Sequence, residues 1–94
     1  MSPGSTERRE VLYSGRVQGV GFRYTVRHIA SRYPVGGYVE NLPDGRVRLI
    51  AEGDKPALDE FLGDIDAAMS SNIGRRLVDK QAASSEFTGF EIRL

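Results

Sequence analysis

The sequence predicts an α+β fold in which an antiparallel sheet of four to five strands carries two helices on one face. Several short stretches alternate apolar and polar residues, as strands do, and two longer stretches repeat apolar residues at helical spacing. Turns rich in glycine and proline separate these stretches and give the order strand, helix, strand, strand, helix, strand. The 94 residues suit one small domain, which we expect at residues 10–94 behind a flexible polar arm at 1–9.

The first strand and the first helix lie on either side of a glycine cluster. Residues 10–17 alternate between apolar and polar side chains, which is typical of a strand with one buried face. The segment after the cluster carries one apolar stripe at helical spacing, made up of Phe22, Val26, Ile29, Ala30 and Tyr33. Pro34 and Gly36 then predict the end of this helix.

A hairpin and a second helix follow. Residues 38–42 and 46–52 are predicted strands, and the Pro-Asp-Gly sequence between them is typical of a tight turn. Asp54 is a plausible N-cap, with Pro56 in the first turn of the second helix. The apolar stripe of that helix consists of Leu58, Phe61, Leu62, Ile65 and Met69.

The last part of the chain contains a weaker strand at residues 77–82 and a clearly alternating one at 90–94. Each helix has one apolar face, so the simplest packing places both helices on the same side of the sheet. This is the ferredoxin-like βαββαβ sandwich, with an extra strand possible at the end. The fold alone does not assign a function, because this scaffold carries many.

Composition excludes several classes of function. Basic and acidic residues balance at 13 each, so no global field favours nucleic acid or an anionic membrane. Cysteine is absent, which excludes disulfides and a thiol nucleophile and suits the cytoplasm. The polar start is no signal peptide, and no stretch approaches the roughly 20 apolar residues of a membrane helix. No cluster of metal ligands is present, so we expect neither a metal nor another cofactor.

The glycine cluster between the first strand and the first helix has two readings. It is not a Walker loop, because Phe22 and Arg23 follow Gly21, and it is not a dinucleotide loop, because Tyr24 stands where a glycine is needed. A glycine-rich turn before a helix nevertheless suits an anion, and Arg23 in the first turn could bind one. The alternative is a tight turn with a solvated arginine, and these residues alone leave both open.

Two further polar residues invite a functional reading. Asn41 ends the second predicted strand, and by itself a hydrogen bond to the turn backbone is the favoured interpretation. His28 is the only histidine, and it lies nearly opposite the apolar stripe of the first helix, as a solvated residue would. Arg27 and Arg32 also read as solvated surface.

Three segments together resemble the acylphosphatases. They are GRVQGVGFR at residues 15–23, GYVENLPDGRV at 37–47 and AEG at 51–53. The resemblance implies metal-independent hydrolysis of a small-molecule acyl phosphate by a cytoplasmic enzyme. The sequence does not fix the oligomeric state, and we take a monomer as the default expectation. The resemblance implies that Arg23 and Asn41 are catalytic, with Asn41 orienting the attacking water. It also implies that the phosphate is held by the Arg23 guanidinium and by the backbone amides of the loop, which comprises Gln18, Gly19, Val20, Gly21, Phe22 and Arg23.

The sequence departs from the family pattern in two places. Tyr33, Pro34 and Val35 replace the usual Leu-Gly-Leu after the first helix, and SSNIGRR at residues 70–76 lacks the usual Gly-Pro. Two other functions compete with catalysis. One is RNA binding on the sheet face, whose aromatic signature is absent from this sequence. The other is a non-catalytic relative that binds phosphate or a protein bearing an acyl phosphate.

Overall fold

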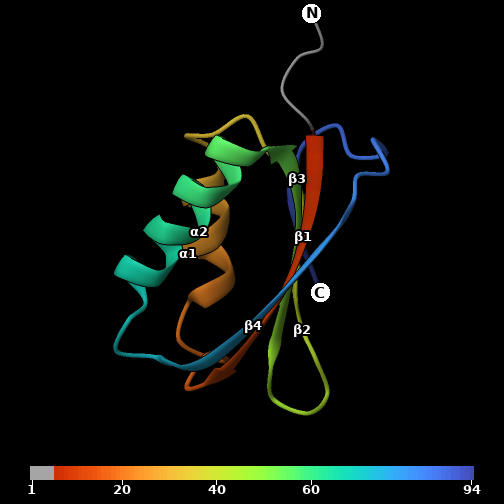
Figure 1. Cartoon of the computed structure of the whole chain (residues 1–94). Coiled ribbons are helices and arrows are strands. Elements are labelled where there is room, and N and C mark those ends of the chain that lie inside the picture. The colour runs from red at the N-terminus through yellow and green to blue at the C-terminus, as the bar shows by residue number, and fades with distance from the viewer. Residues whose placement is uncertain (1–5) are drawn as a thin grey trace, which may run out of the picture.

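The protein is a two-layer sandwich in which two helices cover one face of a five-stranded sheet, as the computed structural model of residues 6–94 shows (Figure 1). Along the described chain the elements are β1 (Thr6–Gly15), α1 (Phe22–Ala30), β2 (Gly36–Asn41), β3 (Val47–Asp54), α2 (Lys55–Ala68), β4 (Ile73–Ala82) and β5 (Phe90–Arg93). The strand order is β4-β1-β3-β2-β5. This arrangement confirms the predicted ferredoxin-like fold.

The core lies between the helices and the sheet. The predicted stripe residues Phe22, Val26 and Ile29 of α1 are buried, as are Leu58 and Phe61 of α2. On the sheet, the alternation expected for the first strand holds, because Val11 and Tyr13 are fully buried against the helices. The apolar periodicities of the sequence therefore mark the side of each element that packs.

Several boundaries differ from those expected. β1 begins at Thr6 rather than Glu10, so only residues 1–5 of the expected arm lie outside the described residues. α1 ends at Ala30, before Tyr33, although Tyr33 still packs against the core. β2 begins at Gly36, two residues before the expected start, and ends at Asn41, one residue before the expected end. β4 begins at Ile73 rather than Leu77.

One pair of strands is parallel, which differs from a wholly antiparallel sheet. β2 pairs with β5 in parallel, and the other neighbours pair antiparallel. β4 ends at the edge of the sheet near the start of β1, and residues 83–89 cross that end to reach the opposite edge. β5 must then run back in the direction of β2, so the parallel pairing follows from where the crossing segment lies.

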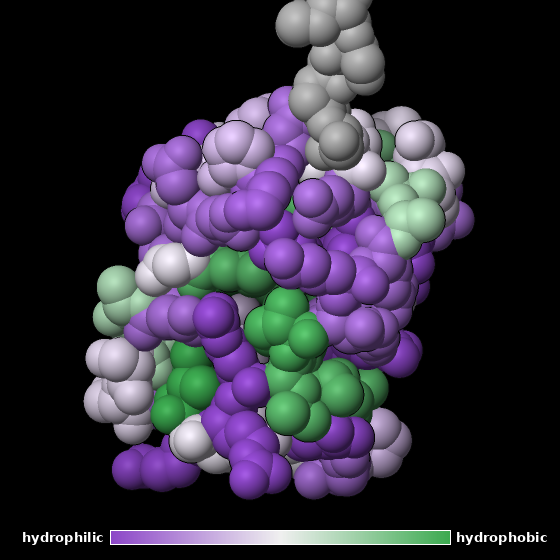
Figure 2. Space-filling view, in the orientation of Figure 1, coloured by the Kyte–Doolittle hydropathy of each residue, from purple (hydrophilic) through white to green (hydrophobic). Residues whose placement is uncertain are grey.

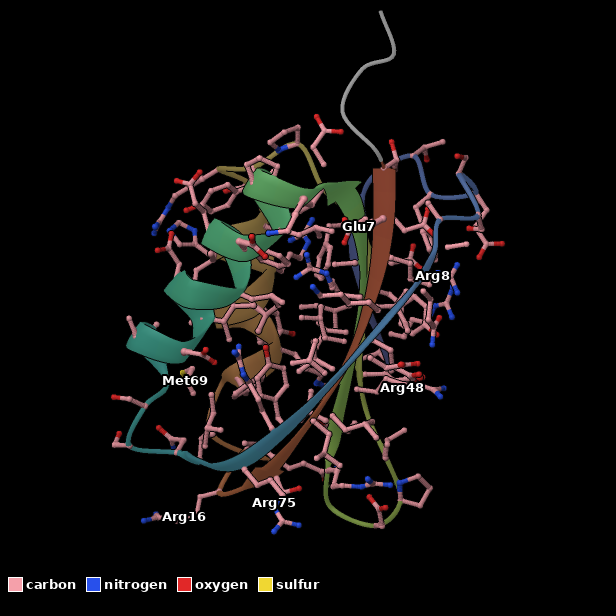
Figure 3. The ribbon with its side chains drawn as sticks, viewed as in Figure 1. Glu7, Arg8, Arg16, Arg48, Met69 and Arg75 are labelled. Atoms are coloured by element: carbon pink, nitrogen blue, oxygen red, sulfur yellow. The ribbon has the colours of Figure 1, made fainter. Side chains whose placement is uncertain are left out.

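The surface in this view is largely hydrophilic, with hydrophobic residues gathered in its middle, where β4 passes in front of the core (Figure 2). β4 is an edge strand, and its Leu77 and Val78 are exposed. Arg8 and Arg48 extend from the sheet on the side away from the helices (Figure 3). The helix side carries the apolar core, and the opposite side carries these charged residues, although Ile50 and Glu52 are also buried there.

Candidate active site

The loop between β1 and α1 lies at the same end of the sheet as the β2–β3 hairpin turn (Figure 1). Its first residues are held by the segment between α2 and β4. The Arg16 amide donates to the Asn72 carbonyl at 2.9 Å, and the Asn72 side chain donates to the Arg16 carbonyl at 3.1 Å. Gly15 has φ +117°, and a Cβ there would lie 2.5 Å from the backbone nitrogen of Gly74. This close approach requires glycine.

The rest of the loop presents unpaired amides. Gly19 and Gly21 have φ of +75° and +77°, a left-handed conformation that glycine adopts without strain. Phe22 is 2% exposed, and its ring lies 5.0 Å from that of Tyr13, which fixes the start of α1 to the core. Within residues 6–94, no backbone amide of residues 18–23 donates a hydrogen bond to another residue. Successive free amides at a helix N-terminus form a concave site for an anion.

The Gln18 side chain ties this loop to the hairpin. Its amide nitrogen donates to the Leu42 carbonyl at 2.8 Å and to the Arg46 carbonyl at 2.9 Å. The side chain is therefore occupied by the protein, and Gln18 can offer only its backbone amide to a bound anion. Sequence reasoning placed Gln18 in the loop but gave no sign of this link, because backbone carbonyls have no signature in a sequence.

Arg23 stands in the first turn of α1 and reaches toward β5. Its guanidinium donates to the carbonyl of Arg93 at 3.1 Å, and the side chain forms no ion pair within the described chain. The guanidinium has five donors, so the remaining ones can bind an anion beside the loop. The Arg93 carbonyl is a second feature that the sequence could not indicate.

Asn41 is the last residue of β2 and is exposed. It shares the parity of the fully buried Val39, so its side chain lies on the face of the sheet that carries the helices and the loop. Its amide forms no hydrogen bond with any described residue. The turn is instead held by the Asp44 carboxylate, which accepts from the Arg46 amide at 3.0 Å. The turn-bonding interpretation of Asn41 is therefore wrong.

The structure brings the candidate residues to one corner. Gln18 bonds to the carbonyl of the residue after Asn41, and Arg23 bonds to the carbonyl of Arg93, which pairs with the residue before Asn41. Glu40, the acid beside Asn41, lies on the other face, where its carboxylate binds Arg48 at 2.7 Å. The loop of free amides and Asn41 thus share the helix side of this corner, and the neighbouring acid does not.

Other features lie away from this corner. His28, Arg27 and Arg32 are exposed, in agreement with the expectation of solvated surface. Residues 6–94 contain no group of three or more His, Cys, Asp or Glu side chains that could hold a metal. Surface hollows of about 460 and 480 Å³ lie beside α1 and beside the 85–89 segment, and neither is lined by residues 18–23 or Asn41. A site that binds a small anion through backbone amides needs no deep cavity.

Comparison with known proteins points to one family. The acylphosphatase family model matches residues 9–92. The acylphosphatase of Archaeoglobus fulgidus is 41% identical over 83 residues, which are 88% of this chain and 93% of that protein. The acylphosphatase of Rubrobacter xylanophilus is 41% identical over 93 residues, or 98% and 84% of the two chains. The crystal structure of Bacillus subtilis acylphosphatase superposes with a TM-score of 0.83 at 30% identity, covering 94% of this chain and 99% of that one. Among the described residues, no helix is long and apolar enough to cross a membrane.

Proposed function

The chain belongs to the acylphosphatase family, and we propose that it hydrolyses its substrate by in-line attack of a water molecule that Asn41 orients. The protein is an acylphosphatase, a hydrolase that splits a small acyl phosphate, the mixed anhydride of a carboxylic acid and phosphate. In the proposed mechanism, the backbone amides of residues 18–23 and the Arg23 guanidinium hold the phosphoryl group.

One observation carries this mechanism. The amides of residues 18–23 are adjacent, have no partner among the described residues and adjoin an arginine that has no ion pair there. Backbone amides and a guanidinium are suited to the charge spread over the three outer oxygens of a phosphoryl group in transfer. The positive end of the α1 dipole adds to this attraction. The site can therefore stabilise the transition state without a metal.

The leaving group explains why so few side chains are needed. The water oxygen forms a bond to phosphorus while the bond from phosphorus to the acyl oxygen breaks. The carboxylate leaves with the bonding electron pair, and the attacking water gives up a proton, so the products are a carboxylate and inorganic phosphate. A carboxylate is a good leaving group and needs no general acid. What remains is to position the water and the phosphoryl group, which is the main task in phosphoryl transfer.

Asn41 is suited to hold the water because its side-chain amide is not bonded to the described protein and lies on the loop's side of the sheet. A neutral amide oxygen can accept a hydrogen bond from water and direct the oxygen lone pair toward phosphorus. All the groups in this mechanism come from one chain, so a monomer suffices for it, and we propose that the enzyme is monomeric. We place it in the cytoplasm, in keeping with its lack of cysteine.

The open face of the sheet does not favour the RNA-binding alternative. The basic side chains at its centre are paired with acids: Arg48 binds Glu40 and Glu10, and Arg8 binds Glu52. The ring of Tyr38 is covered by the Arg93 guanidinium at 3.6 Å from its centroid. Arginines neutralised in this way offer little attraction to phosphates, and a covered ring cannot stack on a base.

Asn41→Ala tests the mechanism with benzoyl phosphate as substrate. Because the amide acts on the attacking water, kcat should fall by a factor on the order of 10²–10³. KM and inhibition by inorganic phosphate should change little, because the loop and Arg23 remain. Asp44→Ala is the matched control: it removes a turn hydrogen bond three residues away and should lower the melting temperature while kcat stays near wild type. An unchanged kcat in folded Asn41→Ala would exclude Asn41 from the mechanism.

A further inference from the structure

The side chain of Gln18 joins the two parts of the proposed site. The backbone of Gln18 belongs to the loop of free amides, and its side chain bonds to the Leu42 and Arg46 carbonyls at 2.8 and 2.9 Å. Asn41 and Val47 are the last paired residues of the hairpin. Leu42 directly follows Asn41, and Arg46 directly precedes Val47. One side chain therefore spans the distance from the phosphate site to the strand end that carries Asn41.

The geometry leaves one orientation for this amide. Both partners are carbonyl oxygens, which only accept hydrogen bonds, so the NH₂ end of the Gln18 side chain must face them. Each of its two N–H groups then has its own acceptor, and the plane of the amide is fixed. A half-buried side chain that makes two hydrogen bonds in this way holds the loop and the hairpin at a defined separation.

No other hydrogen bond among the described residues links the loop to the hairpin. The Arg16–Asn72 bonds hold the beginning of the loop to the segment after α2, and Phe22 holds its end in the core. Arg23 bonds to β5, and the Asn41 amide has no partner of its own in the described protein. Without Gln18, the separation between the loop and Asn41 would depend on these more distant attachments.

We infer that Gln18 is a positioning residue that sets the separation between the bound phosphoryl group and the water held by Asn41. The inference rests on the proposed function. In-line attack needs the water at a near-attack distance from phosphorus, and a misplacement of about 1 Å can cost about 10²-fold in rate. The side chain of Gln18 does not touch the reacting atoms in this assignment; it acts through the hairpin that carries Asn41.

Gln18→Met tests the assignment because it keeps the length of the side chain and removes both donors. We expect kcat for benzoyl phosphate to fall by a factor on the order of 10–10². Competitive inhibition by inorganic phosphate should stay within a few-fold of wild type, because the loop amides and Arg23 still bind it. Parallel losses of kcat and phosphate affinity would overturn the inference, because they would mean that Gln18 shapes only the anion site.

Two further variants guard against a general loss of stability. Gln18→Glu keeps the size and places an acceptor against two carbonyls, so its kcat should fall at least as far as that of Gln18→Met. Gln81→Met is the matched control, because the half-buried Gln81 amide also bonds to two acceptors, Glu10 at 3.1 Å and Asp79 at 2.8 Å. Gln81 lies on β4, and its variant should keep wild-type kcat.

A double-mutant cycle with Asn41→Ala is decisive. If Gln18 acts through Asn41, Gln18→Met should lower kcat in the wild type but change it by less than about 2-fold in the Asn41→Ala background. A change of that size is about the scatter seen when the effects of independent substitutions are added. The same large factor in both backgrounds would overturn the inference and leave the proposed function standing. If Asn41→Ala alone keeps wild-type kcat, the proposed function fails at the water and the inference fails with it.

Discussion

Replacing Glu52 with glutamine should destabilise the fold far more than removing the exposed charge of Glu86, which pairs with the same arginine, Arg8. Glu52 is 6% exposed at the end of β3, on the face of the sheet without helices. Its carboxylate accepts from the Ser84 amide at 2.8 Å, the Ser85 amide at 2.9 Å and the Arg8 guanidinium at 2.8 Å. Glu52 therefore holds the segment between β4 and β5 against the sheet, and we call its bonds to Arg8, Ser84 and Ser85 the clasp.

The magnitude follows from this environment. Glutamine keeps the shape but has one acceptor oxygen, so its NH₂ end would face backbone donors, and Arg8 would lose a buried partner. Breaking a buried pair typically costs about 3–5 kcal/mol. Arg8 is 20% exposed and keeps Glu86, so we expect about 2–3 kcal/mol. In a domain of this size that lowers the melting temperature by roughly 10–20 °C.

Thermal unfolding followed by circular dichroism measures this, with Glu86→Gln as the control. Glu86 binds the same Arg8 at 2.9 Å, but its side chain is 60% exposed, so its loss should cost less than about 1 kcal/mol. If Glu52→Gln lowers the melting temperature no more than Glu86→Gln does, the clasp contributes no more than a surface pair and the reasoning is refuted.

The pH dependence gives a second test of the same clasp. Burial alone raises the pKa of the Glu52 carboxyl, but the hydrogen bonds from Ser84, Arg8 and Ser85 outweigh it and hold the pKa below its usual range. A carboxyl with a lowered folded pKa contributes stability that is present above the unfolded pKa, about 4.3, and is lost as the pH falls through the folded pKa. The difference in melting temperature between wild type and Glu52→Gln should therefore be large at pH 7 and shrink in acid.

Two further predictions concern the anion site and the sheet. Arg23→Ala should weaken both turnover and competitive inhibition by inorganic phosphate, because a charge-assisted contact is lost; Arg23→Lys should restore only part of each. Wild-type phosphate affinity in Arg23→Ala would place the anion elsewhere. Gly37→Ala should cost more than about 3 kcal/mol in chemical denaturation, because φ there is +144° and a Cβ would lie 1.9 Å from the Ile50 carbonyl oxygen. A near-native stability of that variant would contradict the close strand approach.

The sequence predicted most of the packed elements because their periodicity reflects burial on one side. It failed where burial comes from distant segments. Ile50 and Glu52 occupy the polar side of their strand by alternation, yet both are buried. The crossing segment after β4 bonds to Glu52 through Ser84 and Ser85, and its Phe87 packs on Tyr38, the partner of Ile50 in β2. The start of β4 was missed for the opposite reason: after the half-buried Ile73, residues 74–76 belong to an edge strand and are all exposed, so they show no alternation.

The candidate site divides in the same way. The loop, Arg23 and Asn41 were predicted as a site from the resemblance of two segments to the acylphosphatases, because the residues alone left Arg23 open and favoured a turn contact for Asn41. Their roles remain predictions. The attachments that hold them could not be predicted, because the partners are the backbone carbonyls of Leu42, Arg46 and Arg93. Any residue supplies such a carbonyl, so only the folded arrangement identifies them.

The two departures from the family pattern bear directly on the proposed mechanism. Tyr33 packs on Phe61 with the ring centroids 6.0 Å apart and donates its hydroxyl to Asp64, so it fastens the end of α1 to α2. β2 then enters in register, with Asn41 opposite Val47.

The second departure supplies Asn72, which binds Arg16 at the start of the loop. Each substituted segment thus makes its own contacts at a place that positions one half of the site. Through these contacts, the placement of Asn41 and the loop in this chain depends on Tyr33 and Asn72. The proposed mechanism therefore requires these two residues to act as local supports, although neither comes near the phosphoryl group.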